Sequence, residues 1–435
     1  MLCLAMLFFP VVGIAQSRLV PNKVTLKDGK SFSLNLPTDF EIIPALEGLK
    51  RVRFSAKAPD GRIFATDMFN LTDNKRGTVY ILDGWNAETG KFTRAIPYMT
   101  NLRNPNSVQF YRDPSGQDWL YLAETDKLTR RRFARGEIKP TDARPRTLAT
   151  FPGNGLSYKY GGWHLTRTIA FSPAGKLYIS VGSSCNACKE KEKVRASIVE
   201  MNPDGSGQRE FARGLRNAVG LRWFGNFLFA ANQGSDHLGL EKPDETFYSV
   251  KDGADYGWPY CHSSGGKVFA DPGFKRPGQC TKVTAPYAWF PARSSALGFD
   301  YFDDADSPEL IKNAFLVSLH GSTNKAIGHG YKIVIMRKGE KLHDLVTGFL
   351  QRGKVVGRPC DILKLTPTSF LFSDDFTGTV YLVRQKGTAS EITDTLSPVP
   401  EENSAIPTDG KPKACLSAAL VIASFLFCSS SKSLL

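Results

Sequence analysis

Side chains that can exchange protons or hold negative charge recur at one point of a repeated pattern in this sequence. They stand immediately before segments in which apolar and polar residues alternate, and the set comprises Asn104, Asn106, His164, Arg216, Asn217, Ser294, Ser295 and Arg358. A histidine with arginines suits a general base that removes a hydroxyl proton beside cations that stabilise negative charge on an acceptor. Because the set is short of carboxylates, the paired acid/base chemistry of glycosidases is not expected.

The elements that must position these side chains form a repeat. An alternating segment, a Gly turn and a second alternating segment recur in units that begin at residues 52, 107, 168, 219, 297 and 361. Alternation with period two is typical of strands, and Asp-Gly, Ser-Gly and Ala-Gly pairs supply the positive φ that tight turns need. The spacing suits four-stranded blades joined by long loops. The sequence therefore predicts an all-β fold, a six-bladed β-propeller, with residues 40–48 pairing with the last blade to close the ring.

A propeller brings equivalent points of its blades together around the axis, so the polar set is expected to line one mouth of the channel. Loops between the second and third strands open onto the same face. They add Gln233, Gly234 and Ser235 from the fourth unit and His320 from the fifth. The mouth is therefore expected to gather imidazoles, guanidiniums and amides.

Composition favours one large all-β domain. The 435 residues are 41% hydrophobic and 11% aromatic, which is ample for a large core. The net charge is +14, but the basic residues are scattered, with one cluster at Arg130, Arg131 and Arg132. A solvated basic loop explains that cluster, and no nucleic-acid partner is expected.

Both ends of the chain carry apolar runs. Residues 1–16 fit a signal peptide that ends in a small-x-small cleavage site, so export to a periplasmic or extracellular location is expected. The propeller is assigned to residues 18–386 and a polar linker to 387–413, before a hydrophobic tail at 414–435. The tail's apolar stretch is shorter than the roughly 20 residues that span a bilayer. A removable GPI signal, a marginal membrane anchor and an extension without function all remain open.

Cysteine usage agrees with export, because oxidising compartments favour disulfides. Cys185 and Cys188 form a C-x-x-C, and Cys261 and Cys280 bracket a Gly/Pro-rich loop. Pairing within each couple is predicted, and Cys360 is left over.

Several stretches, taken in order, resemble the pyrroloquinoline-quinone (PQQ)-dependent glucose/sorbosone dehydrogenase family. They are YGGWHLTRTIAFSPAGKLYISVGSSCNAC at 160–188, FARGLRNAVGLRW at 211–223, NQGSDHLG at 232–239, DGADYGWPYC at 252–261, LHGSTNKAIGHGYKIV at 319–334 and GRPCDILKL at 357–365. GLRN followed by YGWP is more specific than either motif alone. The resemblance covers nearly the whole propeller and implies a quinoprotein that oxidises an aldose or a sugar aldehyde. The sequence has no C-x-x-C-H motif for haem attachment, so a separate electron acceptor is expected.

The resemblance also implies roles for particular residues. His164 is similar to the general base of the family, and Arg216 and Asn217 match the pair that contacts the quinone oxygens. Gly234 and Ser235 fall where backbone carbonyls hold Ca²⁺ against the cofactor. Cofactor contacts are also implied for Gln233, His320, Lys325 and Arg358.

The sequence departs from the family at the cofactor contacts. Cys360 follows Arg358 where the family has a second arginine, and His320 replaces a lysine, with Lys325 close by in the same loop. Ser235 replaces the usual proline beside the calcium-binding glycine. The alternative function is a non-catalytic propeller that binds a carbohydrate or a protein. Calcium-dependent lactone hydrolysis, a third possibility, needs more carboxylates at the axis than the set offers.

Overall fold

The computed structural model describes residues 18–142, 144–152 and 164–389. The signal peptide at 1–16, the tail at 414–435 and nearly all of the linker lie outside the described residues, so those assignments remain predictions. No helix in the part of the chain that the structure describes has the length and apolar character to cross a membrane.

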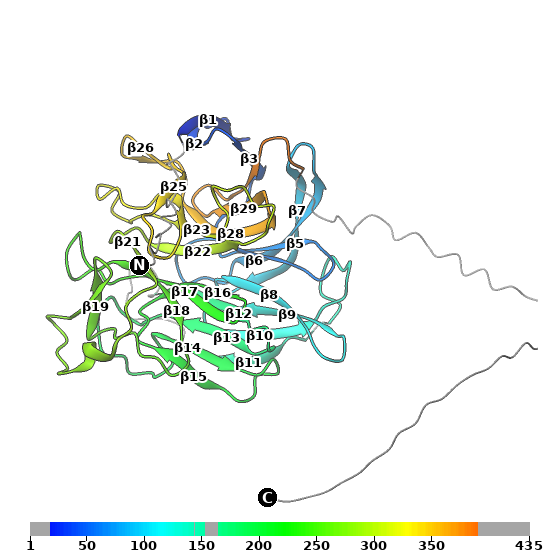
Figure 1. Ribbon diagram of the computed structural model, residues 1–435. Helices are drawn as coiled ribbons and strands as arrows, with labels where there is room; N and C mark the ends of the chain where they lie inside the picture. The colour runs from blue at the N-terminus through cyan, green and yellow to red at the C-terminus, as the bar shows by residue number, and fades with distance from the viewer. Residues whose placement is uncertain (1–17, 143, 153–163, 390–435) are drawn as a thin grey trace, which may run out of the picture. The chain divides into compact units, whose positions relative to one another are not determined.

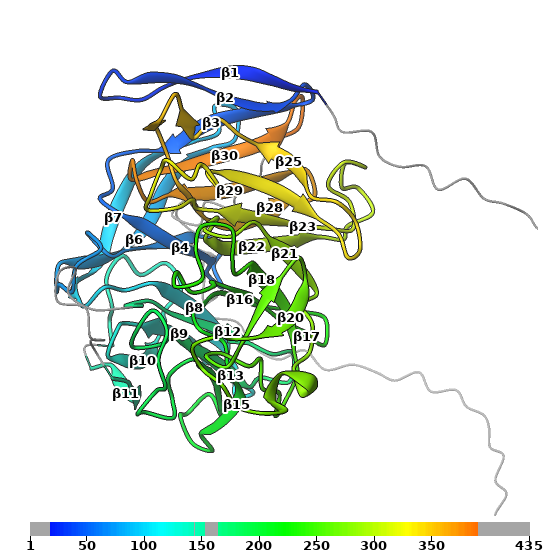
Figure 2. The ribbon, with the colours of Figure 1, turned by 90° about the vertical axis from the view of Figure 1, so that its left-hand side faces the viewer.

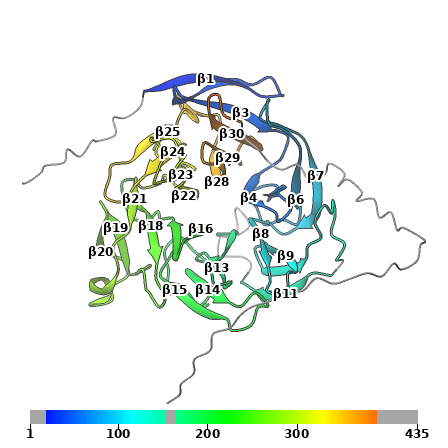
Figure 3. The same ribbon diagram turned by 45° about the vertical axis from the view of Figure 1, so that its right-hand side comes forward.

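Six four-stranded antiparallel sheets form the body of the described chain, and each is one blade of a β-propeller (Figure 1). Figure 3 shows the sheets arranged around a common centre, with β4, β8, β16, β22 and β28 close to it. The first three blades are made of β4 (Val52–Lys57), β5 (Ile63–Asp67), β6 (Gly77–Asn86) and β7 (Lys91–Leu102); β8 (Ser107–Arg112), β9 (Asp118–Ala123), β10 (Lys127–Arg132) and β11 (Arg146–Thr150); and β12 (Arg167–Phe171), β13 (Leu177–Val181), β14 (Ser197–Met201) and β15 (Arg209–Arg213).

The last three blades complete the ring. They are made of β16 (Ala218–Phe224), β17 (Phe227–Asn232), β18 (Glu245–Val250) and β21 (Ala288–Phe290); β22 (Ala296–Phe302), β23 (Ala314–Leu319), β24 (Lys332–Met336) and β25 (His343–Val346); and β28 (Pro359–Thr366), β29 (Ser369–Asp374), β30 (Thr379–Gln385) and β3 (Phe40–Leu46). The predicted six-bladed propeller is confirmed, because each sequence repeat supplies the first two strands of one blade.

Three short pairs lie outside the blades. They are β1 (Leu19–Thr25) with β2 (Ser31–Pro37), β19 (Cys261–Ser264) with β20 (Lys267–Ala270), and β26 (Leu350–Gln351) with β27 (Lys354–Val355). One 3₁₀ turn, η1 (Gln279–Lys282), follows β20. In Figure 2 the β1–β2 hairpin runs along the outside of the last blade, next to β3.

Closure of the ring depends on the N-terminal strand β3. It pairs antiparallel with β30, with Phe40 opposite Gln385 and Ile42 opposite Val383. The predicted pairing of residues 40–48 with the last blade is therefore confirmed. This contact joins the two ends of the propeller and removes two exposed sheet edges.

The turns inside the blades explain why the Gly pairs recur. Gly61, Gly116 and Gly175 stand between the first and second strands of blades one to three and have φ of 88°, 86° and 77°. A residue with a Cβ is disfavoured in that conformation. The alternation of the flanking strands then places one set of side chains against each neighbouring blade.

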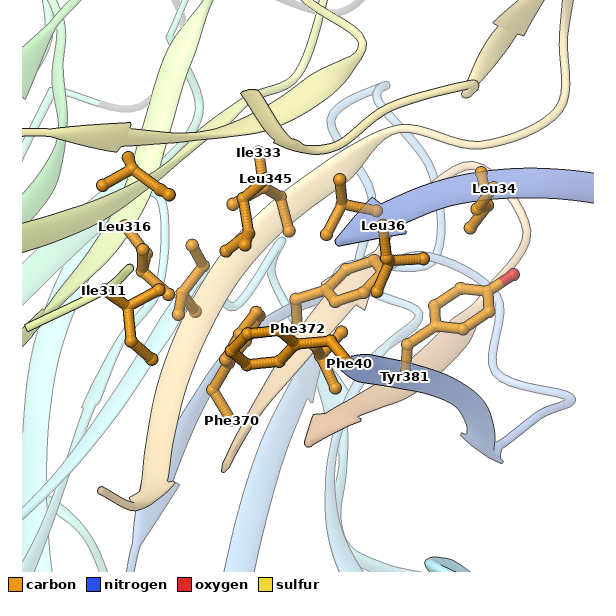
Figure 4. Packing of buried hydrophobic residues seen from close by; sticks show 14 of the residues in the cluster. Leu34, Leu36, Phe40, Ile311, Leu316, Ile333, Leu345, Phe370, Phe372 and Tyr381 are labelled. Carbon is orange, nitrogen blue, oxygen red and sulfur yellow. The ribbon is translucent and has the colours of Figure 1, made fainter. Parts of the chain in front are cut away.

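The hydrophobic core lies between neighbouring blades. Figure 4 shows the cluster formed by the fifth and sixth blades with the β1–β2 hairpin, in which Leu34 and Leu36 pack against Phe40, Phe372 and Tyr381. All five side chains are buried. The hairpin therefore covers apolar surface that the closing blade would otherwise expose.

Both predicted disulfides, Cys185–Cys188 and Cys261–Cys280, are present. Cys360 is the free cysteine among the described residues, and it is buried.

Candidate active site

One mouth of the channel gathers the predicted polar residues. The first strand of each blade begins at this face and the second strand ends there, so residues before β12 and β16 meet the loops after β13 and β17. The loop after β13 contacts the residue before β16 directly, because Ser183 N donates to Arg216 O at 2.8 Å. Gln233 N likewise donates to Asn217 O at 3.0 Å. The convergence expected from the repeat is therefore present on blades three and four.

Apolar side chains from four inner strands form a cluster below this mouth. Phe54, Val219, Leu297 and Cys360 pack together and are buried. Burial raises the pKa of the Cys360 thiol, so the side chain is neutral. Cys360 therefore belongs to a buried apolar cluster of the inner strands, whereas the resemblance places a cofactor-binding arginine at this position.

His164 lies at the edge of the third blade in a geometry that selects one tautomer. Its Nδ1 is 2.9 Å from Ser183 O and 3.0 Å from Ser183 Oγ. Because a carbonyl oxygen only accepts, the proton is on Nδ1 and the lone pair is on Nε2. Burial, followed by the positive charge of Arg216, holds the pKa of His164 well below its usual 6.5. The partly exposed imidazole is therefore neutral at pH 7 and able to accept a proton.

Gly182 leaves room for His164 and Asn217 to lie close together. A Cβ at Gly182 would stand 2.4 Å from Asn217 Oδ1 and 2.6 Å from His164 Cβ. His164 and Asn217 thus approach each other across the end of β13, where a larger residue would force them apart.

Arg216 is held by the neighbouring loops. Its Nε donates to Asn186 O at 2.8 Å, and one terminal nitrogen donates to Asn186 Oδ1 at 3.0 Å. The other terminal nitrogen donates to Gly234 O at 2.8 Å. Burial lowers the pKa of Arg216 to about 10, so the guanidinium stays charged at pH 7. Asn217 Nδ2 donates to Gln233 Oε1 at 2.7 Å, which completes a bonded network behind His164.

The carbonyls predicted as Ca²⁺ ligands already have cationic partners. Gly234 O accepts from Arg216, and Ser235 O accepts from Arg293 at 3.1 Å. Ca²⁺ needs several oxygen ligands at 2.3–2.6 Å and is repelled by a guanidinium at the same oxygens. This donor set does not fit Ca²⁺, in contrast to what the resemblance implies for Gly234 and Ser235.

A second charged cluster surrounds Asp375, which is fully buried in the loop after β29. Its Oδ2 accepts from Arg53 at 2.6 Å and lies 3.3 Å from Arg51, and its Oδ1 is 2.7 Å from His320 Nε2. Burial alone would raise the pKa of Asp375, but His320 and the two arginines hold it far below its ordinary range. Burial lowers the pKa of His320 to about 4, so at pH 7 His320 is a neutral donor to Asp375. His320 thus supports the arginines and does not itself supply positive charge.

Arg358 and Lys325 differ in how they are held. Arg358 donates to Gly321 O at 3.2 Å, to the Tyr331 hydroxyl at 3.2 Å and also to Ser322 O. Lys325 is exposed, and its side chain makes no hydrogen bond or ion pair with the residues that the structure describes. Hydrogen bonds therefore hold the Arg358 side chain against the loop that carries Lys325.

The remaining predicted residues support the backbone. Asn104 accepts from Asn74 N at 2.9 Å and donates to Thr72 O at 2.8 Å. Asn106 accepts from Arg53 Nε at 3.1 Å and donates to Thr168 Oγ1 at 3.0 Å, which links blades one to three. Ser294 donates to Pro291 O at 2.6 Å, and Ser295 O accepts from His320 N at 3.0 Å.

Four further charged residues of this region, Arg51, Arg53, Asp375 and Arg293, were not among those predicted from the sequence. The positional rule that found the other residues would have included most of them. Arg51 stands directly before β4 and Arg53 within it, while Asp375 lies between the second and third strands of the last blade. Arg53 lies close enough to Cys360 for its positive charge to oppose the rise in the thiol pKa, although burial outweighs that effect. A guanidinium is thus present beside the position where the family's second arginine is missing.

Two cavities flank the fourth blade. The larger, about 760 Å³, is lined by residues 189–190 and 192–197 and by residues that include Arg213, Trp258 and Arg276, and none of the predicted site residues line it. The smaller, about 30 Å³, is lined by Arg216, Gln233, Gly234 and Ser235 among others. The smaller cavity therefore touches predicted cofactor residues, whereas the larger one is lined by other residues.

No protein-family model matches the chain. An uncharacterized protein of Borreliella burgdorferi is 26% identical over 373 residues, which are 80% of this chain and 96% of that protein. The fold is similar to that of the PQQ domain of pyranose dehydrogenase from Coprinopsis cinerea, with TM-score 0.66, 18% identity and coverage of 81% and 97% of the two chains.

Two further solved structures are similar. A calcium structure of a Trichoderma reesei carbohydrate-active enzyme of family AA12 has TM-score 0.66 at 17% identity, covering 80% of this chain and 96% of that one. The soluble aldose sugar dehydrogenase of Escherichia coli, in its apo form, has TM-score 0.56 at 14% identity, covering 79% and 99%. The predicted resemblance is thus confirmed for the fold, and the chain has the six-bladed propeller fold of PQQ-domain and sugar dehydrogenase structures.

Proposed function

We propose that this protein is an exported dehydrogenase that oxidises an aldose or a sugar aldehyde with PQQ as the electron acceptor. The observation that carries the proposal is His164. Its Nδ1 proton is committed to Ser183 O and its pKa is held well below 6.5 by burial and by Arg216, so at pH 7 Nε2 is unprotonated and lies near a cation. A base for a hydroxyl proton and a positive charge for a developing oxyanion are the two groups that this oxidation requires.

The charges at the mouth fit an anionic quinone. The Arg51 side chain is 19% exposed and lies 3.3 Å from Asp375, which places its positive charge with that of Arg53 at the start of the first blade. Arg216, Asn217 and Gln233 would contact the quinone oxygens, and Arg51 and Arg358 would face its carboxylates, with His320 and Lys325 beside them. Ca²⁺ is not part of the proposal, because guanidiniums hold its expected carbonyl ligands.

The chain's own residues would remove the proton and stabilise negative charge. His164 Nε2 accepts the proton of the sugar hydroxyl, and Ser183 keeps the ring in the required tautomer. Arg216, fixed by Asn186 and Gly234, holds a positive charge next to this base. Bound PQQ supplies a two-electron acceptor for the hydride of the substrate.

The acid limb of the pH profile is expected below pH 6.5. His164 must be neutral to accept a proton, and a lowered pKa keeps it neutral at more acidic pH than an ordinary histidine. The measurement is kcat/KM against pH from 4 to 8. A limb centred at or above 6.5 would contradict the environment assigned to His164.

The test of the function is dye-linked oxidation of a panel of aldoses and sugar aldehydes by the purified protein. PQQ and Ca²⁺ are added together, singly and not at all. Activity that depends on PQQ supports the proposal and shows which sugars fit. No turnover, together with no change in quinone absorbance on titration, would reject it.

A non-catalytic propeller that binds a carbohydrate or a protein remains the second candidate. The observation that favours it is that the guanidiniums of Arg216 and Arg358 are already bonded to backbone carbonyls. A glycan array probed with the same protein discriminates the two, because binding without any quinone titration favours the second candidate.

A further inference from the structure

Backbone oxygens of the loop between β17 and β18 converge on guanidinium groups. Gly234 O accepts from Arg216 at 2.8 Å. The next oxygens accept from Arg293, with Ser235 O at 3.1 Å and Asp236 O at 2.9 Å. Arg293 also donates to Gly239 O and to the Asp236 carboxylate. One side chain thus satisfies three carbonyls and one carboxylate of a single loop.

The position of Arg293 is built into the fold. It lies in the segment between β21 and β22, and its backbone has φ of 68°, a left-handed conformation that is uncommon for a residue with a side chain. Buried Glu245 accepts from Gly234 N at 3.2 Å. Burial raises the pKa of Glu245 to about 7, and the backbone N–H groups of Gly234, Ser295 and Arg293 oppose that rise, so Glu245 lies against both loops. The Arg293 side chain is only 9% exposed. The guanidinium is therefore held from both ends.

The oxygens that face Arg293 are of the kind that bind a hard divalent cation. Carbonyl and carboxylate oxygens are the ligands that Ca²⁺ prefers, and Ca²⁺ binds where the lone pairs of several such oxygens converge on one position. A guanidinium satisfies the same lone pairs with planar N–H donors and one permanent charge. Arg293 and an ion cannot occupy these oxygens together, and Arg216 adds a second positive charge at the adjacent carbonyl.

We propose that Arg293 is a resident cation that takes the place of a divalent ion at this mouth, so that the protein holds an anionic ligand without Ca²⁺. The ligand, a quinone that carries carboxylates, rests on the proposed function. The replacement of the ion does not, because it depends only on the contacts of Arg293.

Calorimetric titration of the purified protein with CaCl₂ tests the replacement. The wild type is expected to show no binding up to about 1 mM, the weak end of extracellular calcium modules. Arg293→Ala frees the oxygens of Ser235, Asp236 and Gly239 and is expected to bind Ca²⁺ at least tenfold more tightly. Arg213→Ala is the matched control, since Arg213 also pairs with carboxylates, Glu210 and Asp255, but faces no convergent carbonyls in the described residues. It is expected to behave as the wild type.

Two results would overturn the proposal. One is calcium binding by the wild type below about 1 mM, and the other is an Arg293→Ala protein that binds no more tightly than the wild type. If the Arg293→Ala protein does not fold, Arg293→Gln is titrated in its place with the same expected result. The wild-type titration tests the proposal independently of either variant.

Quinone titration by absorbance separates this inference from the proposed function. PQQ binding that is unchanged by EGTA supports the replacement, and PQQ binding that requires added Ca²⁺ contradicts it. A protein that binds no PQQ in either buffer counts against the proposed function, and the calorimetric result then decides the role of Arg293.

Discussion

His164→Asn is expected to reduce kcat for the sugar substrate by about 10²- to 10⁴-fold, the range for loss of a positioned general base. The amide of asparagine can still donate to Ser183 O, so the local fold is retained, but it cannot accept the hydroxyl proton. Steady-state dye reduction at saturating PQQ measures the effect, and thermal unfolding checks that the protein is folded.

His329→Asn is the matched control for this substitution. His329 is also partly buried, and its Nδ1 is bonded to a backbone carbonyl, Ala292 O, at 2.8 Å. It is not among the residues that contact Arg216 or Asn217 in the described structure. Its replacement should leave kcat within about twofold of the wild type. Equal losses in the two variants, or full activity in His164→Asn, would remove His164 from the role of base.

Asp375→Asn is expected to lower the free energy of unfolding by about 3–5 kcal/mol at pH 7, the cost of leaving a buried charge without its partner. The substitution removes the carboxylate that lies 2.6 Å from Arg53 and 3.3 Å from Arg51, and Arg53 is almost wholly buried. Urea unfolding followed by fluorescence gives the difference. Asp344→Asn, which breaks the half-exposed Lys332–Asp344 pair at 2.7 Å, is expected to cost less than about 1 kcal/mol.

The contribution of Asp375 should depend on pH in one direction. A carboxyl group whose pKa is lowered in the folded state stabilises the fold above its unfolded pKa of about 3.8, and that stabilisation is lost as pH falls through the folded value. The difference between wild type and Asp375→Asn should therefore be constant from pH 5 to 7 and shrink below about pH 4. A difference that grows on acidification, or one equal to that of Asp344→Asn, would show that Asp375 does not neutralise the arginines.

The order of the blades and the closure of the ring were predictable because they depend on local patterns. Period-two alternation and the Gly turns at 61, 116 and 175 depend on residues within about twenty positions of one another, and the same pattern recurs in each repeat. Even the pairing of β3 with β30 follows from one unpaired apolar segment and one incomplete blade. The disulfides were predictable for the same reason, since each couple is close in sequence.

Part of the site was also predictable from position in the repeat. His164, Arg216 and Asn217 stand before the first strands of neighbouring blades and Gln233 follows a second strand at the same face, and the structure joins them in one hydrogen-bonded network. Position in the repeat predicts the face of the propeller at which a side chain lies, but it does not predict which residue that side chain bonds to. His320 illustrates the limit, because its place at the mouth was foreseen but its bond to Asp375 was not.

The sequence by itself determined the propeller, its closure and the positions from which polar side chains enter the mouth, because strand periodicity and turn chemistry are local properties of the chain. Only the tertiary structure decided how the charges pair. Arg53 meets Asp375 across 322 positions of sequence, and Arg293 meets Ser235 across 58. These contacts depend on the geometry of the closed ring and on burial, which lowers the dielectric around each charge and requires a nearby partner for it. For this reason the sequence indicates a lost arginine at Cys360, whereas in the structure Cys360 is buried in an apolar cluster and Arg53 supplies a guanidinium near it.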